Sequence, residues 1–89
     1  MGTILVKDGC MREIKPMNGE YFTPLEIDSY LDGAPFAYVL NEKRAVLVGV
    51  LAKEKGKPVN AVATSWIREV DPSDYVCGPA ILIDTKLIR

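Results

Sequence analysis

A run of lysines is the clearest candidate for binding chemistry in this chain. Lysines stand at positions 53, 55 and 57, and Asn60 after them is a good cap for a helix. The backbone N–H groups at the start of a helix favour an anion. A phosphate or a nucleotide is therefore a candidate ligand for Lys53, Lys55, Gly56, Lys57 and Asn60. The spacing differs from the Gly-x-x-x-x-Gly-Lys-Ser/Thr pattern of phosphate-binding loops, so an ordinary solvated turn is the alternative.

An acidic segment is the second candidate, and its expected role is recognition of another protein. Glu26, Asp28 and Asp32 fall within the stretch that should form the first helix. We expect such a negative surface to dock on a basic groove of a partner, with an affinity that falls steeply as salt is added. In the alternative interpretation this helix face is only solvated, with Glu26 capping the helix and Asp28 close to its positive end.

The chain contains no histidine, and this absence excludes several kinds of active site. A Ser-His or Cys-His nucleophile pair and a histidine-ligated metal all need the imidazole group. Cys10 and Cys77 lie far apart in sequence, form no Cys-x-x-Cys pair, and are expected to be free thiols. Neither has a histidine to activate it. We therefore expect a protein that is not an enzyme, with no catalytic residues, no cofactor and no metal.

Composition and charge narrow the class of protein further. Of the 89 residues, 48% are hydrophobic and 26% charged, as in folded globular domains, and the length suits a single domain over 1–89. Eleven basic and twelve acidic side chains give a net charge of −1, which argues against direct binding to nucleic acid. The sequence has no apolar run of membrane-spanning length and no secretion signal. These features predict a cytoplasmic protein that makes no membrane contact.

Two hairpins are predicted to form most of a sheet. The apolar segment 3–7 is followed by Asp8-Gly9, a strong signal for a two-residue turn, and 10–15 is the expected return strand. A second hairpin is expected from 36–40 and 45–51 across a polar loop. The segment 45–51 is apolar on both faces, so it is expected to lie centrally in the sheet.

Two short helices are predicted, one before and one after the second hairpin in sequence. Thr23 is a typical N-cap, and Glu26 completes a capping box for a helix over about 24–32. Asn60 is the expected cap of the second helix, and 80–83 is the expected last strand. The order β-β-α-β-β-α-β predicts an α+β fold, a single two-layer domain. In it, an antiparallel or mixed sheet of about five strands carries both short helices on one face.

Several short motifs, in their order, resemble a family of small uncharacterised proteins carried by phages, prophages and plasmids. That family has a Lys-Pro-x-Asn-Gly loop, a Phe-Thr helix start and a Pro-x-Asn-x-x-Ala-Thr helix. The matching residues are Lys15-Pro16-Met17-Asn18-Gly19, Phe22-Thr23 and Pro58-Val59-Asn60-Ala61-Val62-Ala63-Thr64. The likeness covers about residues 11–85. It departs near the end, where Pro79 stands in place of an aspartate.

The resemblance implies a biological context but no mechanism, because the family has no established activity to transfer. It implies a non-enzymatic accessory protein of a mobile genetic element that works in the host cell cytosol. The expected partner is a host or rival protein, such as a CRISPR nuclease of an antiviral defence system. Two alternatives remain open: a small-molecule binder that sequesters a nucleotide at the lysine turn, and a structural homo-oligomer.

Overall fold

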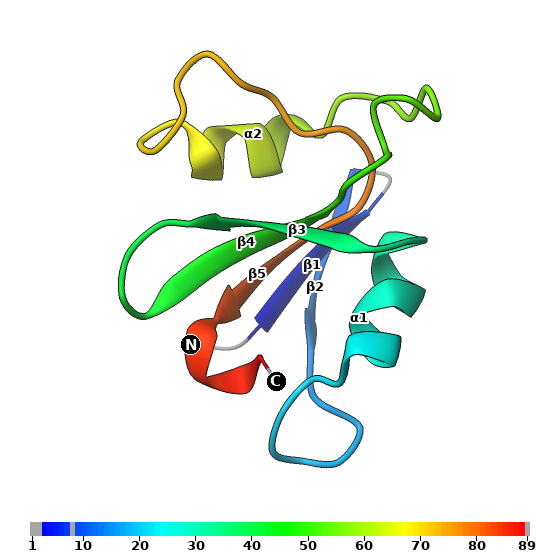
Figure 1. Cartoon of the computed structure of the whole chain (residues 1–89), viewed down its shortest axis with the longest axis vertical. Coiled ribbons are helices and arrows are strands. Elements are labelled where there is room, and N and C mark those ends of the chain that lie inside the picture. Colours follow the sequence, from blue (N-terminus) through cyan, green and yellow to red (C-terminus); the bar gives the residue numbers. More distant parts are fainter. Residues whose placement is uncertain (1–2, 8, 89) are drawn as a thin grey trace.

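A five-stranded antiparallel sheet runs through the middle of the molecule, with one helix on either side of it (Figure 1). The computed structural model describes residues 3–7 and 9–88. The elements of these residues are β1 (Thr3–Lys7), β2 (Cys10–Ile14), α1 (Pro24–Leu31), β3 (Pro35–Val39), β4 (Arg44–Gly49), α2 (Ala61–Ile67), β5 (Ala80–Asp84) and a short 3-10 helix (Thr85–Leu87). Their order confirms the predicted succession of elements and the α+β fold.

The last strand in sequence lies at the centre of the sheet. The strand order is β2-β1-β5-β4-β3, so β5 joins the first hairpin to the second. Leu82 of β5 is opposite Ile4 on one side and Val46 on the other. The central position suits β5 because residues 80–83 are apolar and buried at every position. Residues 45–48 of β4 share this property, and β4 lies in the interior of the sheet as predicted.

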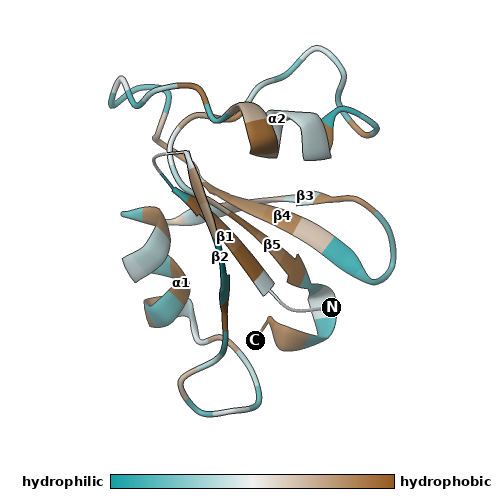
Figure 2. Ribbon diagram, turned by 180° about the vertical axis from the view of Figure 1, so that it is seen from behind, coloured by the Kyte–Doolittle hydropathy of each residue, from teal (hydrophilic) through white to brown (hydrophobic). Residues whose placement is uncertain are grey.

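The two helices lie on opposite faces of the sheet, so the predicted two-layer arrangement with both helices on one face is wrong (Figure 2). Successive side chains of a strand point to opposite faces. Strands that are apolar at every position therefore leave both faces to be covered. Odd-numbered residues of β4 and β5 pack on the α1 side, and even-numbered residues pack on the α2 side.

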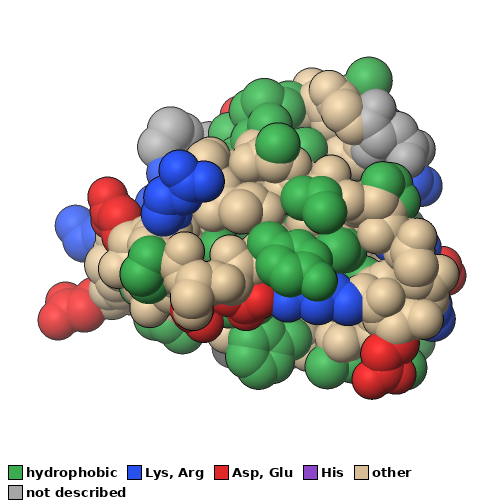
Figure 3. Space-filling view, turned by 90° about the horizontal axis from the view of Figure 1, so that it is seen from above, with side chains coloured by type: hydrophobic (Ala, Val, Ile, Leu, Met, Phe, Trp, Pro, Cys, Tyr) green, Lys and Arg blue, Asp and Glu red, His purple; other side chains and the backbone are tan. Residues whose placement is uncertain are grey.

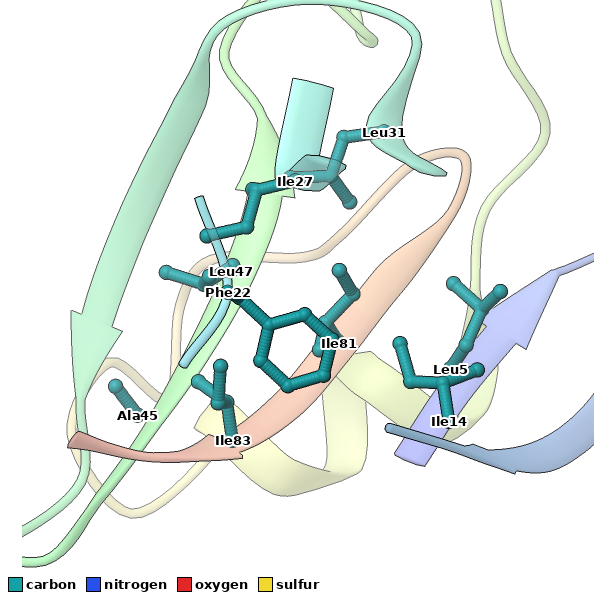
Figure 4. Close-up of a cluster of buried hydrophobic side chains, with 9 residues drawn as sticks. All are labelled: Leu5, Ile14, Phe22, Ile27, Leu31, Ala45, Leu47, Ile81 and Ile83. Atoms are coloured by element: carbon teal, nitrogen blue, oxygen red, sulfur yellow. The ribbon is translucent and has the colours of Figure 1, made fainter. Parts of the chain in front are cut away.

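Each face has its own hydrophobic cluster. The cluster on the α1 side, shown in Figure 4, consists of Leu5, Ile14, Phe22, Ile27, Leu31, Ala45, Leu47, Ile81 and Ile83. The cluster on the α2 side consists of Val46, Val48, Ala63, Ile67, Val76, Ala80 and Leu82. Phe22 belongs to the first cluster and is fully buried. Its backbone N–H donates to the carbonyl oxygen of Leu87 at 2.7 Å, so it also holds the C-terminal segment against the core.

The first helix begins and ends with the residues that the sequence suggested, with one difference in detail. The hydroxyl of Thr23 accepts a hydrogen bond from the N–H of Glu26 at 3.2 Å, which confirms the N-cap. The helix ends at Leu31, and Asp32 takes the left-handed conformation (φ 56°, ψ 49°) that a glycine would normally take. The predicted helix over about 24–32 therefore extends one residue beyond the observed end at Leu31.

The first hairpin has the predicted register. Lys7 is paired with Cys10, which leaves a two-residue connection between the strands, and Gly9 has the positive φ of 78° that such a turn needs. Asp8, the other residue of the predicted turn, lies outside the described residues.

Gly78 allows two segments to pass close to each other before β5 begins. Its N–H donates to the carbonyl oxygen of Pro58 at 2.9 Å, and its φ of 74° is left-handed. An added Cβ would lie 2.8 Å from Cδ of Lys57 and 3.4 Å from Cβ of Ala52. The backbone conformation and the available space both favour glycine at this position.

Gly78→Ala is therefore expected to lower the free energy of unfolding by about 2–3 kcal/mol. The alanine must adopt a left-handed backbone conformation, and its Cβ clashes with the Lys57 side chain. Gly56→Ala is the matched control, since Gly56 has a similar φ of 71° but no atom within 4 Å of an added Cβ. We expect the control to lose only about 1 kcal/mol. Urea unfolding measures both losses, and equal losses would show that the contact with Lys57 and Ala52 is unimportant.

Candidate functional site

The structure brings part of the predicted basic cluster together with part of the predicted acidic one. Nζ of Lys57 lies 3.0 Å from Oδ2 of Asp32, and Nζ of Lys55 donates to the backbone oxygen of Asp32 at 3.2 Å. Lys57, and then Lys55, lower the pKa of the Asp32 carboxyl below its usual value. These residues, expected to form two separate surfaces, thus form one exposed ion-pair cluster at the C-terminal end of α1.

Glu26 does not belong to an acidic docking surface. Only 7% of this residue is exposed, and Oε2 accepts the backbone N–H of Met17 at 3.0 Å. In a capping box, the Glu26 carboxylate would bond to the backbone N–H of the N-cap residue at the start of its own helix. Here the carboxylate instead fixes the loop that precedes the helix. Asp28 is half-buried and Asp32 is paired with Lys57. The predicted surface of Glu26, Asp28 and Asp32 is therefore wrong for Glu26, because the loop folds over it.

Asn60 is held by structural contacts. Its Oδ1 accepts from the N–H of Ala63 at 3.0 Å, which confirms the predicted cap of α2. Its Nδ2 donates to the carbonyl oxygens of Gly78 at 2.9 Å and Val6 at 3.3 Å. The side chain thus links the start of α2 to β1 and to the residues before β5. A polar side chain with these commitments is not free to receive a phosphate.

The predicted anion site is divided by the fold. Lys57 and Asn60 line a cavity of about 470 Å³ together with Lys7 and Gly78. Lys55 and Gly56 do not line it, and Lys53 contacts a different part of the molecule. The turn that joins the three lysines bends between them, so their side chains point to different parts of the molecule. Their spacing in the sequence does not indicate this bend.

Lys53 belongs to a cluster around Asp74 that the sequence did not reveal. Nζ of Lys53 lies 2.5 Å from Oδ1 of Asp74, and the hydroxyl of Tyr38 donates to Oδ2 of the same carboxylate. Nζ of Lys53 also lies 4.1 Å from the centre of the Tyr75 ring, a cation–π contact. The N–H of Tyr75 donates to Oδ1 of Asp74 at 2.8 Å. One carboxylate therefore orients the side chains of Lys53 and Tyr38 and also accepts from the backbone of Tyr75, so it joins three separate segments.

These hydrogen bonds shift the titration of the groups that make them. Lys53, then the Tyr38 hydroxyl and the Tyr75 N–H, lower the pKa of Asp74 to about 2. Burial, and then the hydrogen bond to Asp74, raise the pKa of the Tyr38 hydroxyl. The same carboxylate raises the pKa of Lys53. At neutral pH the cluster therefore holds an ionised aspartate, a charged lysine and a neutral tyrosine.

Asp74 is expected to make stability depend on pH in acid. A carboxyl group with a lowered pKa in the folded state stabilises the fold above its unfolded value of about 3.9, and this contribution is lost as pH falls towards 2. We expect the stability difference between the wild type and Asp74→Asn to be constant above about pH 5 and to shrink between about pH 4 and 2. Unfolding experiments across this range measure it. A difference that does not change with pH would contradict the role of the charged carboxylate.

Exposed hydrophobic side chains surround this cluster. Phe36, Val50 and Tyr75 are 49%, 52% and 46% exposed, and they line a hollow of about 170 Å³ together with Tyr38 and Lys53. We call these five residues the Tyr75 patch. The rings of Phe36 and Tyr38 pack edge to face at 5.1 Å. Figure 3, seen from the α2 side, shows hydrophobic side chains gathered around adjoining basic and acidic ones.

The Tyr75 patch joins residues from β3, from the loop after β4 and from the loop after α2. Its members were not identified as a site from the sequence, because they are up to 39 positions apart and neither Phe36 nor Tyr75 belongs to a recognisable motif. A tight turn lies beside the patch, where the N–H of Asp74 donates to the carbonyl oxygen of Asp71 at 3.3 Å.

The cysteines, the possible metal ligands and the helices of the described residues give three further observations. Cys10 is exposed, Cys77 is buried and both are free thiols, as predicted. Within residues 3–7 and 9–88, histidine, cysteine, aspartate and glutamate side chains form no group of three or more suited to a metal. Neither helix in these ranges has the length and apolar character needed to cross a membrane.

The fold and the site define a small α+β domain with an open-edged antiparallel sheet and an exposed aromatic patch beside one edge. No protein-family model, no curated protein and no solved structure matches the chain.

Proposed function

We propose that this protein acts by binding another protein through the Tyr75 patch, and that it catalyses no reaction. The observation that carries the proposal is the half-exposed pair of aromatic rings, Phe36 and Tyr75, around a hollow beside an anchored lysine. Exposed apolar patches of this kind mark interaction sites in folded proteins, and tyrosine is enriched among the residues that dominate binding energy. Contacts to Asp74 fix the Tyr38 and Lys53 side chains in advance, which lowers the entropy that binding must remove.

The resemblance of residues 11–85 to proteins of phages, prophages and plasmids supports a more specific proposal. In that context the partner is a host or rival protein, for example a CRISPR nuclease or another component of antiviral defence, and the binding takes place in the host cytosol. The protein would then be an accessory factor of a mobile genetic element that inhibits its target by occupying a surface of it.

Capture of a partner from host lysate on immobilised protein, followed by measured affinities of variants, tests the proposal. Tyr75→Ser should lower the affinity for the captured partner by at least about 30-fold, the loss expected for a residue at the centre of an interface. Leu25→Ser is the matched control, because Leu25 is 82% exposed on α1, on the other side of the sheet. Equal affinity of both variants and the wild type would contradict the proposal.

The cavity of about 470 Å³ favours a second candidate function, the binding of a small anionic molecule or nucleotide beside Lys7 and Lys57. Titration with ATP and with inorganic phosphate, followed by the amide resonances of Lys57, Val59 and Asn60, tests it. Lys57→Met should abolish any shift that reflects binding. An absence of shifts at millimolar ligand would exclude this function.

A further inference from the structure

We propose that two copies of this protein pair through the outer edges of their β3 strands, which would run antiparallel across a two-fold axis beside Ala37. The two five-stranded sheets would then join into one continuous sheet. The pairing goes beyond the proposed function and does not rest on it. It gives a definite form to the homo-oligomer that the sequence left open as an alternative.

Hydrogen bonds at the two ends of β3 fix which of its residues bond to β4. The N–H of Leu40 donates to the carbonyl oxygen of Arg44 at 3.0 Å, and the N–H of Val50 donates to that of Ala34 at 2.9 Å. In an antiparallel pair, hydrogen-bonded and non-hydrogen-bonded positions alternate along the strand. The even-numbered residues of β3 therefore bond to β4.

The odd-numbered residues of β3 consequently direct their backbone groups away from β4. The sheet ends at β3, so the N–H and C=O groups of Ala37 and Val39 face outward from its edge. Pro35 also directs its carbonyl oxygen outward, but it has no N–H to offer. The edge thus presents donors at Ala37 and Val39 and acceptors at all the odd-numbered residues of the strand.

The two edges of the sheet differ in how they are protected. β2, at the other edge, carries the exposed charges of Arg12 and Glu13, and charged side chains are a common device against unwanted strand pairing. β3 carries no charge at all, and Phe36 and Val39 are 49% and 61% exposed. An uncharged, apolar edge of this kind is where another strand adds to a sheet.

The outward backbone groups of β3 are complementary to those of a second β3. A pairing centred on Ala37, the middle residue of the strand, matches every residue of β3 with a residue of the other copy. Ala37 would donate to and accept from its own counterpart, and the N–H of Val39 would donate to the carbonyl oxygen of Pro35 in the other copy. Each copy gives the bonds that it receives, as a closed two-fold interface requires.

The side chains of β3 are complementary in the same register. On the α2 face, Phe36 would lie opposite Tyr38 of the other copy, and the two rings already pack edge to face at 5.1 Å within one copy. Aromatic cross-strand pairs of this kind stabilise antiparallel sheets. On the α1 face, Pro35 would lie opposite Val39, and at the axis Ala37 would meet only a second alanine. Apolar groups therefore meet apolar groups along the whole strand.

The charges around the two ends of β3 are balanced, which favours an uncharged occupant. Around its start they are those of Lys55, Lys57, Asp32 and Glu54. After its end they are those of Lys43, Arg44, Glu42 and Asp84, the last of which is paired with Arg44 in the β4–β5 register. Antiparallel pairing brings the start of one β3 beside the end of the other, so like charges are not concentrated. A strongly charged strand would find no excess of opposite charge here, whereas a second β3 is itself uncharged.

Pairing through β3 also gives an assembly that stops at two copies. It uses both β3 edges and leaves only the β2 edges, which carry Arg12 and Glu13. A strand of five residues with its neighbouring side chains is smaller than the roughly 20–30 residues per side of a standard interface. We therefore expect a weak dimer, with a Kd on the order of 100 µM. Both Tyr75 patches would lie on the same face of the joined sheet.

Sedimentation and hydrogen exchange of the wild-type protein, each from micromolar to millimolar concentration, test the pairing. Sedimentation should show a monomer that becomes a dimer as concentration rises. Exchange at the amides of Ala37 and Val39 should slow at least threefold over the same range. The amides of Phe36 and Tyr38 are the internal control, because they bond to β4 in either state and should not respond. A monomer at millimolar concentration, or a dimer in which Ala37 and Val39 exchange as before, overturns the inference.

Charged substitutions at Ala37 test the two-fold register, because this residue would face its own counterpart. Ala37→Lys and Ala37→Glu should each dimerise at least about fivefold more weakly than the wild type, since like charges lie directly opposite. An equimolar mixture of the two variants should regain wild-type association. Met11→Lys is the matched control, because Met11 is 55% exposed on the other edge strand, and it should dimerise normally.

The outcomes separate this pairing from other occupants of the edge. Circular dichroism checks that the Ala37 variants fold, and the wild-type exchange experiment stands without them. If the mixture of variants associates no better than either variant alone, Ala37 does not lie at the axis and the inference fails. If Ala37 and Val39 become protected only when the partner captured from lysate is added, a different protein occupies the edge. That result overturns the pairing and leaves the proposed function intact.

Discussion

Phe22→Ala is expected to cause the largest loss of stability of any single truncation discussed for this protein. The side chain is fully buried among the residues of the α1-side cluster, where removal of an aromatic ring typically costs about 3–5 kcal/mol. A domain of this length has a total stability of only about 4–13 kcal/mol. We therefore expect the midpoint of thermal unfolding to fall by roughly 15–30 °C, measured by calorimetry or circular dichroism.

Phe36→Ala is the matched control, because Phe36 is the other phenylalanine of the chain and is 49% exposed. It should lower stability by no more than about 1 kcal/mol, since it removes much less buried surface. The two variants also separate folding from binding, because Phe36 belongs to the Tyr75 patch and Phe22 does not. Similar losses of stability from both would contradict the described packing of Phe22.

Asn60→Ala is expected to lower the free energy of unfolding by about 2–4 kcal/mol, an unusually large effect for a half-buried polar residue. The substitution removes the cap of α2 and leaves the carbonyl oxygens of Val6 and Gly78 without the Nδ2 donor. β1, α2 and the residues before β5 lose the side chain that links them, so the loss of stability exceeds that from removing an ordinary helix cap. Urea unfolding measures the loss.

Asn60→Asp separates the two parts of this effect. Aspartate caps helices as well as asparagine does, but its second oxygen would face the two carbonyl oxygens and repel them. At neutral pH this variant should therefore be no more stable than Asn60→Ala, and it should recover part of its stability as the carboxyl is protonated in acid. If Asn60→Asp is as stable as the wild type at pH 7, the Nδ2 hydrogen bonds do not matter.

The sequence predicted those parts of the fold that depend on neighbouring residues. The cap at Thr23 and the cap at Asn60 are each decided within a few positions, and both are confirmed. The placement of α1 and α2 on opposite faces was missed, although residues 45–48 and 80–83 are apolar at every position. Strands that are apolar at every position need cover on both faces, and one helix on each face supplies it.

The candidate site was predicted less well, because ion pairs depend on which distant side chains meet. Lys57 and Asp32 are 25 positions apart, and the fold joins them although they were assigned to different surfaces. Lys53, assigned to an anion site, instead contacts Asp74 and Tyr75. The burial of Glu26 depends on a loop that crosses it, and nothing in the local pattern of charges indicated that loop.

The central place of β5 has a consequence for how the protein forms during synthesis. Each hairpin consists of neighbouring strands and can close within microseconds, but the two hairpins share a sheet only through residues 80–84. β5 must therefore leave the ribosome before the sheet can close. Until that moment the edge of β4 that pairs with β5 stays accessible to chaperones and to other nascent chains, so slow translation of the codons between β4 and β5 prolongs the period of aggregation risk.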